Sequence, residues 1–135
     1  MKHTFVNLTN HPAAQWSEAQ RRAAEEYGPI LELPFPAVPE TADLSLVSKL
    51  AALYFRRLRV VENPVVLVQG EAVFTYILVR LLEQARIPAL ACVSRRCVQE
   101  TLLPDGTTEK LAVYSFAGFR PYWESGLDAF QQNDV

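Results

Sequence analysis

The side chains best suited to chemistry come in three short polar stretches, each directly after an apolar run. Amides and hydroxyls beside a helix N-terminus donate hydrogen bonds to a phosphate or a ribose, and a glycine there lets the backbone approach a ligand closely. A basic residue nearby would supply the local positive charge that a nucleotide needs. The stretches are Asn7, Thr9, Asn10 and His11; Gln69, Gly70 and Glu71, with Thr75 one turn further on; and Ser94, Arg95 and Arg96.

His11 is the natural acid–base group of the chain, because the other histidine, His3, lies in or at the start of a strand-like run. Imidazole gains and loses a proton near neutral pH. The sequence has no nucleophile elbow, no histidine pair at helical spacing and no phosphate-binding P-loop. Cys92 and Cys97 lack a base partner and the companions of a zinc site, so we expect both to be structural and expect no metal or cofactor.

Each of these residues also has a plainer interpretation. Asn, Thr and His before a proline are ordinary turn residues, and Glu71 in the first turn of a helix compensates the helix dipole. Adjacent residues on an extended chain point to opposite faces, so only one of Arg95 and Arg96 would face a pocket, and a solvated position is the alternative for each. Arg120, among aromatic residues, either stacks on a base or packs at the sheet edge.

The composition describes one globular domain. The 135 residues are 50% hydrophobic and carry a net charge of −2, which suits a single core without disulfides and disfavours binding of duplex nucleic acid. The longest apolar stretch, Ala72–Leu82, is interrupted twice and is far shorter than the roughly 20 residues of a membrane span. Two cysteines and no cleavage-site pattern near the start predict a cytoplasmic protein that does not enter membranes.

Apolar patterning predicts alternating strands and helices that place the three polar stretches. The predicted strands are His3–Leu8, Pro29–Phe35, Pro64–Gln69 and Ile87–Val93. The predicted helices are Ser17–Tyr27, a second that begins at Asp43 or Ser45 and ends at Arg59, and Glu71–Ala85, and a hairpin joins Val98–Leu103 to Glu109–Phe116. This order predicts an α/β fold, a parallel sheet flanked by helices with an antiparallel hairpin, over residues 1–123, and a polar, partly disordered tail over 124–135. Ligands of such sheets bind beyond the carboxyl ends of the strands, where the three stretches would converge.

The loops, taken in order, resemble those of the small stand-alone CARF-like proteins linked to type III CRISPR systems, some of which are ring nucleases. The resemblance covers about residues 4–123 and implies a Rossmann-like CARF-type domain. It also implies a homodimer whose two pockets form one symmetric cleft for a cyclic oligoadenylate, above all cyclic tetra-adenylate. The motifs that carry it are Asn7–Pro12 with Trp16, Tyr27–Gly28, Pro34–Pro36, Gln69–Glu71 with Phe74–Thr75, Ser94–Arg96 and Phe119–Arg120.

The chemistry that this resemblance implies is metal-independent ring cleavage, in which a ribose 2′-hydroxyl attacks its own 3′-phosphate and leaves a 2′,3′-cyclic phosphate. Arg95 or Arg96 would stabilise the developing charge, and His11 would donate a proton to the 5′-oxygen leaving group. The remaining polar residues would bind the ligand, with Thr9 and Asn10 orienting phosphate and ribose; they are Asn7, Thr9, Asn10, Gln69, Gly70, Glu71, Thr75, Ser94 and Arg120.

The helix Glu71–Ala85 is apolar nearly all round, so it needs packing partners on two sides. Packing against its own copy across a two-fold axis would bury the second side. Pairing would also double the basic residues facing one ligand. Two other functions remain open. One is a CARF-like sensor that binds the ring without cutting it, and the other is a small α/β interaction protein whose polar loops are only turns and caps.

Overall fold

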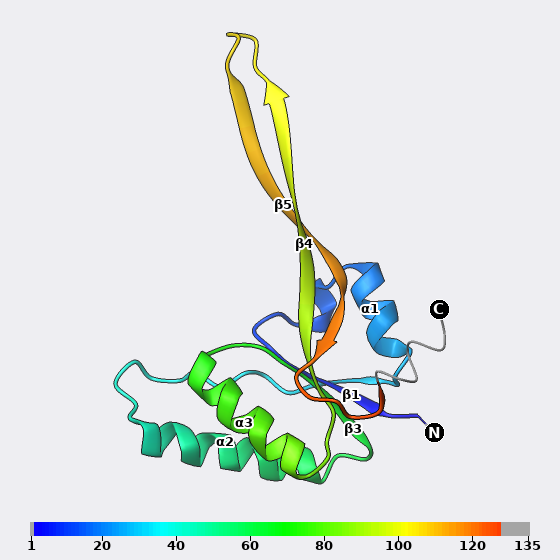
Figure 1. The fold of residues 1–135 in the computed structure, drawn as a ribbon, viewed down its shortest axis with the longest axis vertical. Coiled ribbons are helices and arrows are strands. Elements are labelled where there is room, and N and C mark those ends of the chain that lie inside the picture. Colours follow the sequence, from blue (N-terminus) through cyan, green and yellow to red (C-terminus); the bar gives the residue numbers. More distant parts are fainter. Residues whose placement is uncertain (1, 128–135) are drawn as a thin grey trace.

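The computed structural model describes residues 2–127 and shows one mixed sheet with helices on both faces (Figure 1). The strand order is β2-β1-β3-β4-β5, with β1 to β4 parallel and β5 antiparallel. The elements are β1 Thr4–Leu8, a 3-10 turn η1 Ala13–Gln15, α1 Glu18–Glu25, β2 Ile30–Glu32, α2 Leu44–Arg59, β3 Pro64–Val68, α3 Ala72–Gln84, β4 Ala89–Leu102 and β5 Thr108–Pro121. The predicted α/β fold with flanking helices and a terminal hairpin is confirmed.

Strand alternation divides the buried residues into two cores. Val66 and Val68 of β3 belong to the core under α2 and α3, whereas Val65 and Leu67 belong to the core on the α1 side. Successive side chains of a strand point to opposite faces, so a run that is apolar throughout serves both cores at once. The continuous apolar run of β3 therefore makes it a central strand, as the sequence predicts.

Helix α3 finds its two packing partners within one chain. It packs on the sheet through Phe74, Leu78 and Leu82, and the Phe74 ring meets Tyr54 of α2 edge-on at a centroid distance of 5.5 Å. Val73 and Tyr76 remain exposed. The apolar surface that suggested a dimer axis at this helix is thus largely covered by the sheet and by α2.

The predicted break between the fourth strand and the hairpin was wrong. β4 is one strand of 14 residues, and β5 pairs with it from Leu90 to Leu102 with a single register shift at Val93/Ser94. Ser94, Arg95 and Arg96 therefore lie in mid-strand rather than in a loop after a strand. The physical reason is that β5 supplies hydrogen-bond partners beyond the edge of the parallel sheet, so the ladder continues outward as an arm (Figure 1).

The chain after β5 returns to the domain. The Tyr122 hydroxyl donates to the Val68 carbonyl at 2.8 Å, and the Trp123 indole donates to the Ile87 carbonyl at 3.0 Å. Leu127 packs against the core on the α1 side. The rest of the predicted disordered tail, residues 128–135, lies outside the described residues. Within residues 2–127, no helix combines the length and apolar character that crossing a membrane requires.

Candidate functional site

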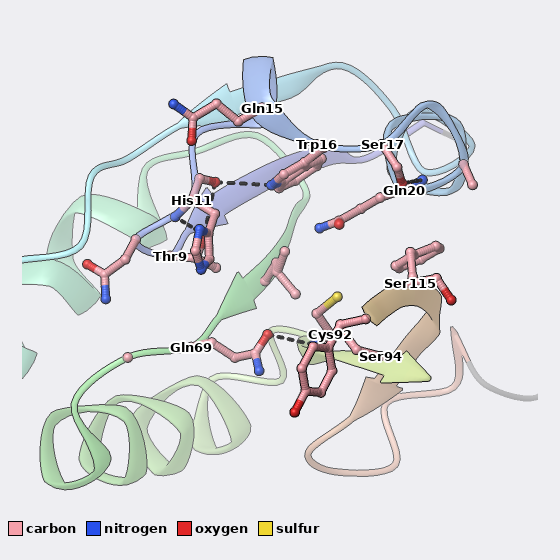
Figure 2. Close-up of a pocket in the computed structure, with 16 residues that line it drawn as sticks. Thr9, His11, Gln15, Trp16, Ser17, Gln20, Gln69, Cys92, Ser94 and Ser115 are labelled. Atoms are coloured by element: carbon pink, nitrogen blue, oxygen red, sulfur yellow. Dashed lines mark hydrogen bonds between the residues drawn. The ribbon is translucent and has the colours of Figure 1, made fainter. Parts of the chain in front are cut away.

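A pocket of about 770 Å³ opens at the carboxyl ends of β1 and β3, at the foot of the arm (Figure 2). β2 lies on one side of β1 and β3 lies on the other, so the direction of the strand order reverses between β1 and β3. Open α/β sheets bind ligands at such a switch point, beyond the carboxyl ends of the strands. The pocket is lined by Thr9, Asn10, His11, Gln15, Trp16, Ser17, Ala19, Gln20, Leu67, Gln69, Gly70, Cys92, Ser94, Tyr114, Ser115 and Phe116.

The lining combines amides and hydroxyls with three aromatic side chains and contains no Asp, Glu, Lys or Arg. A pocket without carboxylates does not repel an anionic ligand, and its amides and hydroxyls serve as both donors and acceptors. No group of three or more His, Cys, Asp or Glu side chains that could hold a metal ion occurs within the described part of the chain. The lining is therefore suited to an organic ligand that carries both flat rings and polar edges.

Asn7 does not line the pocket; its side chain holds the loop after β1 by hydrogen bonds. Its side chain is fully buried, and its Nδ2 group donates to the His11 carbonyl at 2.9 Å and to both carboxylate oxygens of Glu32 at 3.1 Å. Its Oδ1 atom accepts from the Thr9 hydroxyl at 2.8 Å. Glu32 also accepts from the Ala13 amide at 2.7 Å. Asn7, predicted as a ligand-binding residue, thus holds the loop that presents the binding residues.

The backbone of His11 is fixed while its side chain is exposed at the pocket mouth. The His11 amide donates to the Thr9 hydroxyl oxygen at 3.1 Å, and its carbonyl accepts from the Trp16 indole at 3.0 Å (Figure 2). Trp16 in turn packs edge-on against Phe5, with the ring planes at 90°. These contacts orient the indole before any ligand arrives.

Gln69 crosses from the end of β3 to β4. Its Oε1 atom accepts from the Cys92 amide at 2.8 Å, which leaves the Nε2 group as a donor for a ligand (Figure 2). Burial raises the pKa of the Cys92 thiol, so this group stays neutral and acts as an apolar part of the floor. Gln69 is thus a predicted site residue that lines the pocket and whose side-chain amide is held in place by a hydrogen bond.

The two arginines lie beyond the pocket on the arm. Arg96 lies opposite Tyr114, and Ser94 lies opposite Phe116. Cross-strand partners share a face and so do alternate residues of one strand, so Arg96 shares a face with the pocket residues Ser94, Tyr114 and Phe116. Arg95 shares the other face with Ser115, which also lines the pocket at the foot of the arm. Both side chains are exposed, and neither is among the lining residues.

Three further predicted site residues lie outside the lining as well. Glu71 caps α3 by accepting from the Phe74 amide at 2.7 Å, which is the plainer of its two interpretations. The Thr75 hydroxyl is buried on α3 without a hydrogen-bond partner among the described residues. Arg120 is exposed on β5 opposite Ala91. None of the three contacts the pocket in a single chain.

Gly70 does line the pocket, but its small size serves packing. A Cβ atom at this position would lie 2.2 Å from the Phe35 ring. That ring belongs to the core on the α2 and α3 side, where it meets Phe74. The close approach that the glycine permits is therefore made by an aromatic side chain of the protein.

The sequence interpretation missed several residues on both sides of the pocket. Gln15, Trp16 and Gln20 come from η1 and the start of α1, and Tyr114 and Phe116 come from β5. The first group had a usable signal, because the Ser17 cap of α1 was predicted and is present, accepting from the Gln20 amide at 3.2 Å. The second group, Tyr114 and Phe116, had no usable signal in the sequence, because β5 reaches the pocket only through its pairing with β4.

The fold and the pocket define an α/β protein with a pocket at the switch point of its sheet. The chain belongs to the family described as the Uncharacterized protein MJ1673 family, whose model matches residues 3–120. That range includes every residue that lines the pocket and the whole arm. No curated protein matches the chain. The resemblance to CARF-like proteins stays a prediction.

Proposed function

We propose that the pocket binds a cyclic oligoadenylate and that His11 takes part in opening the ring. The observation that carries this proposal is the lining itself, in which aromatic rings and amides meet in a pocket without carboxylates. Aromatic side chains such as Trp16 and Tyr114 are stacking surfaces for a base, worth about 1–3 kcal/mol per base. Gln69 and Asn10 supply the amide groups that recognise base edges and sugar hydroxyls.

The size of the pocket bears on how a ring would be held. About 770 Å³ lies in the range of sites that enclose one ligand of drug size, and a ring of four nucleotides is larger than that. One chain would hold about half of the ring, and a second copy related by a two-fold axis would hold the other half. A homodimer is therefore part of the proposal, as the CARF-like resemblance also implies.

The proposed reaction needs no metal. The 2′-hydroxyl attacks the adjacent 3′-phosphate, the bond from phosphorus to the 5′-oxygen breaks, and a 2′,3′-cyclic phosphate remains. The hydroxyl proton leaves to solvent, and protonated His11 donates a proton to the departing 5′-oxygen. Arg96, which shares a face of the arm with Ser94 and Tyr114, is the group we assign to the charge that develops on the phosphate.

A second candidate is a sensor of the CARF type that binds the ring and leaves it intact. The observation that favours it is the position of the arginines, because neither lines the pocket of one chain. Without a cation at the phosphate, binding through stacking and amides would proceed while the chemical step lacked its electrostatic stabilisation.

The test is incubation of the purified protein with cyclic tri-, tetra- and hexa-adenylate in EDTA, followed by chromatography of the products. Conversion of one ring to linear fragments ending in a 2′,3′-cyclic phosphate supports the enzyme. Intact rings with a thermal shift support the sensor. Intact rings without any shift reject both and leave the interaction protein. Arg96→Ala is expected to lower binding and rate together.

A further inference from the structure

The arm formed by the outer parts of β4 and β5 packs on no other element among residues 2–127. β3 pairs with β4 only at Ala89 and Leu90, so residues 94–116 form a ribbon of two strands and a turn that stands away from the domain (Figure 1). A two-stranded ribbon is marginally stable on its own in water. The side chains on its two faces must therefore account for its persistence.

One face of the arm combines an apolar centre with charged ends. We call it the Arg95 face, and it consists of Arg95, Cys97, Gln99 and Thr101 of β4 with their cross-strand partners Ser115, Val113, Leu111 and Glu109 of β5. Leu111 is 60% exposed and Val113 is 37% exposed in the single chain. These two side chains and Cys97 form the centre, between Arg95 near the base and Glu109 near the tip.

Both faces of the arm carry charged side chains. On the opposite face, Lys110 and Glu100 form an ion pair at 3.5 Å directly across the ladder, and Arg96 has no ion-pair partner within residues 2–127. On the Arg95 face, Arg95 and Glu109 both lack an ion-pair partner within the same residues. The Arg95 face therefore runs from positive through apolar to negative along the arm, with neither end neutralised by a described side chain.

We infer that the Arg95 face binds the same face of a second copy, with the two arms antiparallel about a two-fold axis. Antiparallel pairing sets Arg95 against the partner's Glu109 at both ends and brings the apolar centres together. A parallel arrangement would set like charges against each other, so the order of charges selects a self-complementary, closed dimer.

The extent of the Arg95 face sets the strength of this contact. The Arg95 face supplies eight side chains from each arm, fewer than the roughly 20–30 residues per side of a standard stable interface, so we expect a weak dimer that forms as the protein concentration rises. The pairing leaves the face that carries Ser94 and Tyr114 turned toward the pocket. It does not depend on the ligand or the reaction proposed above, and it is a separate contact from the two-fold axis that would join two pockets over one ring.

Sedimentation equilibrium of the full chain over a range of concentrations tests the pairing. We expect a dimer, and we expect Glu109→Arg to weaken it at least about tenfold, because each dimer loses two symmetric attractions and gains two repulsions. The double variant Arg95→Glu with Glu109→Arg restores opposite charges and should restore the dimer. Glu100→Arg is the matched control on the other face and should leave the dimer constant nearly unchanged.

A second measurement locates the contact in the native sequence. In a Cys92→Ser background, a short bis-maleimide should link Cys97 of two chains, and Glu109→Arg should suppress the linkage. A monomer at every concentration overturns the proposal. So does a dimer that responds equally to Glu109→Arg and Glu100→Arg, or one that fails to cross-link at Cys97, since its contact then lies elsewhere. Circular dichroism of each variant confirms that the fold is retained.

Discussion

The two walls of the pocket are built in different ways. The wall from the β1 loop and α1 is tied by hydrogen bonds that converge on Asn7 and on the His11 carbonyl, and the Trp16 ring also packs on the core. The wall from the arm carries Ser94 and Tyr114, which are exposed, with Tyr114 at 65%. One wall is fixed before a ligand binds, whereas the other must lose side-chain freedom on binding.

This difference determines where binding energy is available. A side chain that is already oriented contributes its full contact energy, whereas an exposed side chain first loses about 0.5–1.5 kcal/mol of rotamer freedom. We therefore expect the β1 wall to set affinity and chemistry, and the arm wall to adapt to the ligand.

The largest effect should come from Asn7→Ala, which removes the centre of the hydrogen-bond network. The variant removes the hydrogen bonds that a fully buried side chain makes to Thr9, to the His11 carbonyl and to the Glu32 carboxylate, and we expect a loss of about 3 kcal/mol in the free energy of unfolding. Urea denaturation measures it. Asn10→Ala, an exposed amide in the same loop, and Ser94→Ala on the arm wall are controls that should each change stability by less than about 0.5 kcal/mol. Equal stability of all three variants would contradict the contrast between the walls.

His11→Ala should separate chemistry from binding. We expect the rate of ring opening to fall about 100-fold, because a proton donor to the leaving oxygen is lost, while the Kd changes by less than about threefold. Single-turnover kinetics and calorimetry give the two quantities. A parallel loss of rate and affinity would remove His11 from the role of acid and make it a binding residue.

The two aromatic walls should differ in affinity. Trp16→Leu is expected to weaken binding of cyclic tetra-adenylate about tenfold, because the fixed indole stacks without an ordering cost. Tyr114→Leu should weaken it only about threefold, since the exposed ring loses rotamer freedom on stacking. Calorimetry measures both constants. A larger loss at Tyr114 than at Trp16 would reverse the assignment of the fixed wall.

The sequence predicted the wall from the β1 loop better than the wall from the arm, because the first follows a buried strand and the second lies on a ribbon exposed to water. Thr9, Asn10, His11 and Gln69 follow buried strands, and the rule that strand ends meet at one edge of a sheet was enough to bring them together. The change from apolar to polar at Ser94 looked like a strand end. A ribbon that water reaches on both faces produces the same change without ending, so local composition does not separate the two cases.

Other parts of the structure depended on contacts that no local pattern encodes. Asn7 and Glu71 have the residue types of a binding site. In the structure, Asn7 is buried and holds the loop after β1 by hydrogen bonds, and Glu71 caps the N-terminus of α3. Their roles are set by Glu32 from β2 and by the orientation of α3, both of which appear only when the chain is folded. By contrast, β3 and α2 were predicted correctly, because the continuous apolar run of β3 and the helical apolar periodicity of α2 reflect directly which side chains are buried.

The smallest effect concerns Cys92, which lies between the two walls. In a Cys97→Ser background only this thiol reacts with iodoacetamide, and burial raises its pKa. Its alkylation rate should therefore keep rising with pH beyond about 8.5, where a free cysteine thiol is already half ionised. Cyclic tetra-adenylate should slow the reaction by a few-fold, because ligand between Trp16 and Tyr114 would cover the floor, and Trp16→Leu should abolish most of that protection. Protection that survives in Trp16→Leu but disappears in Tyr114→Leu would show that the arm, and not the β1 wall, holds the ligand over the thiol.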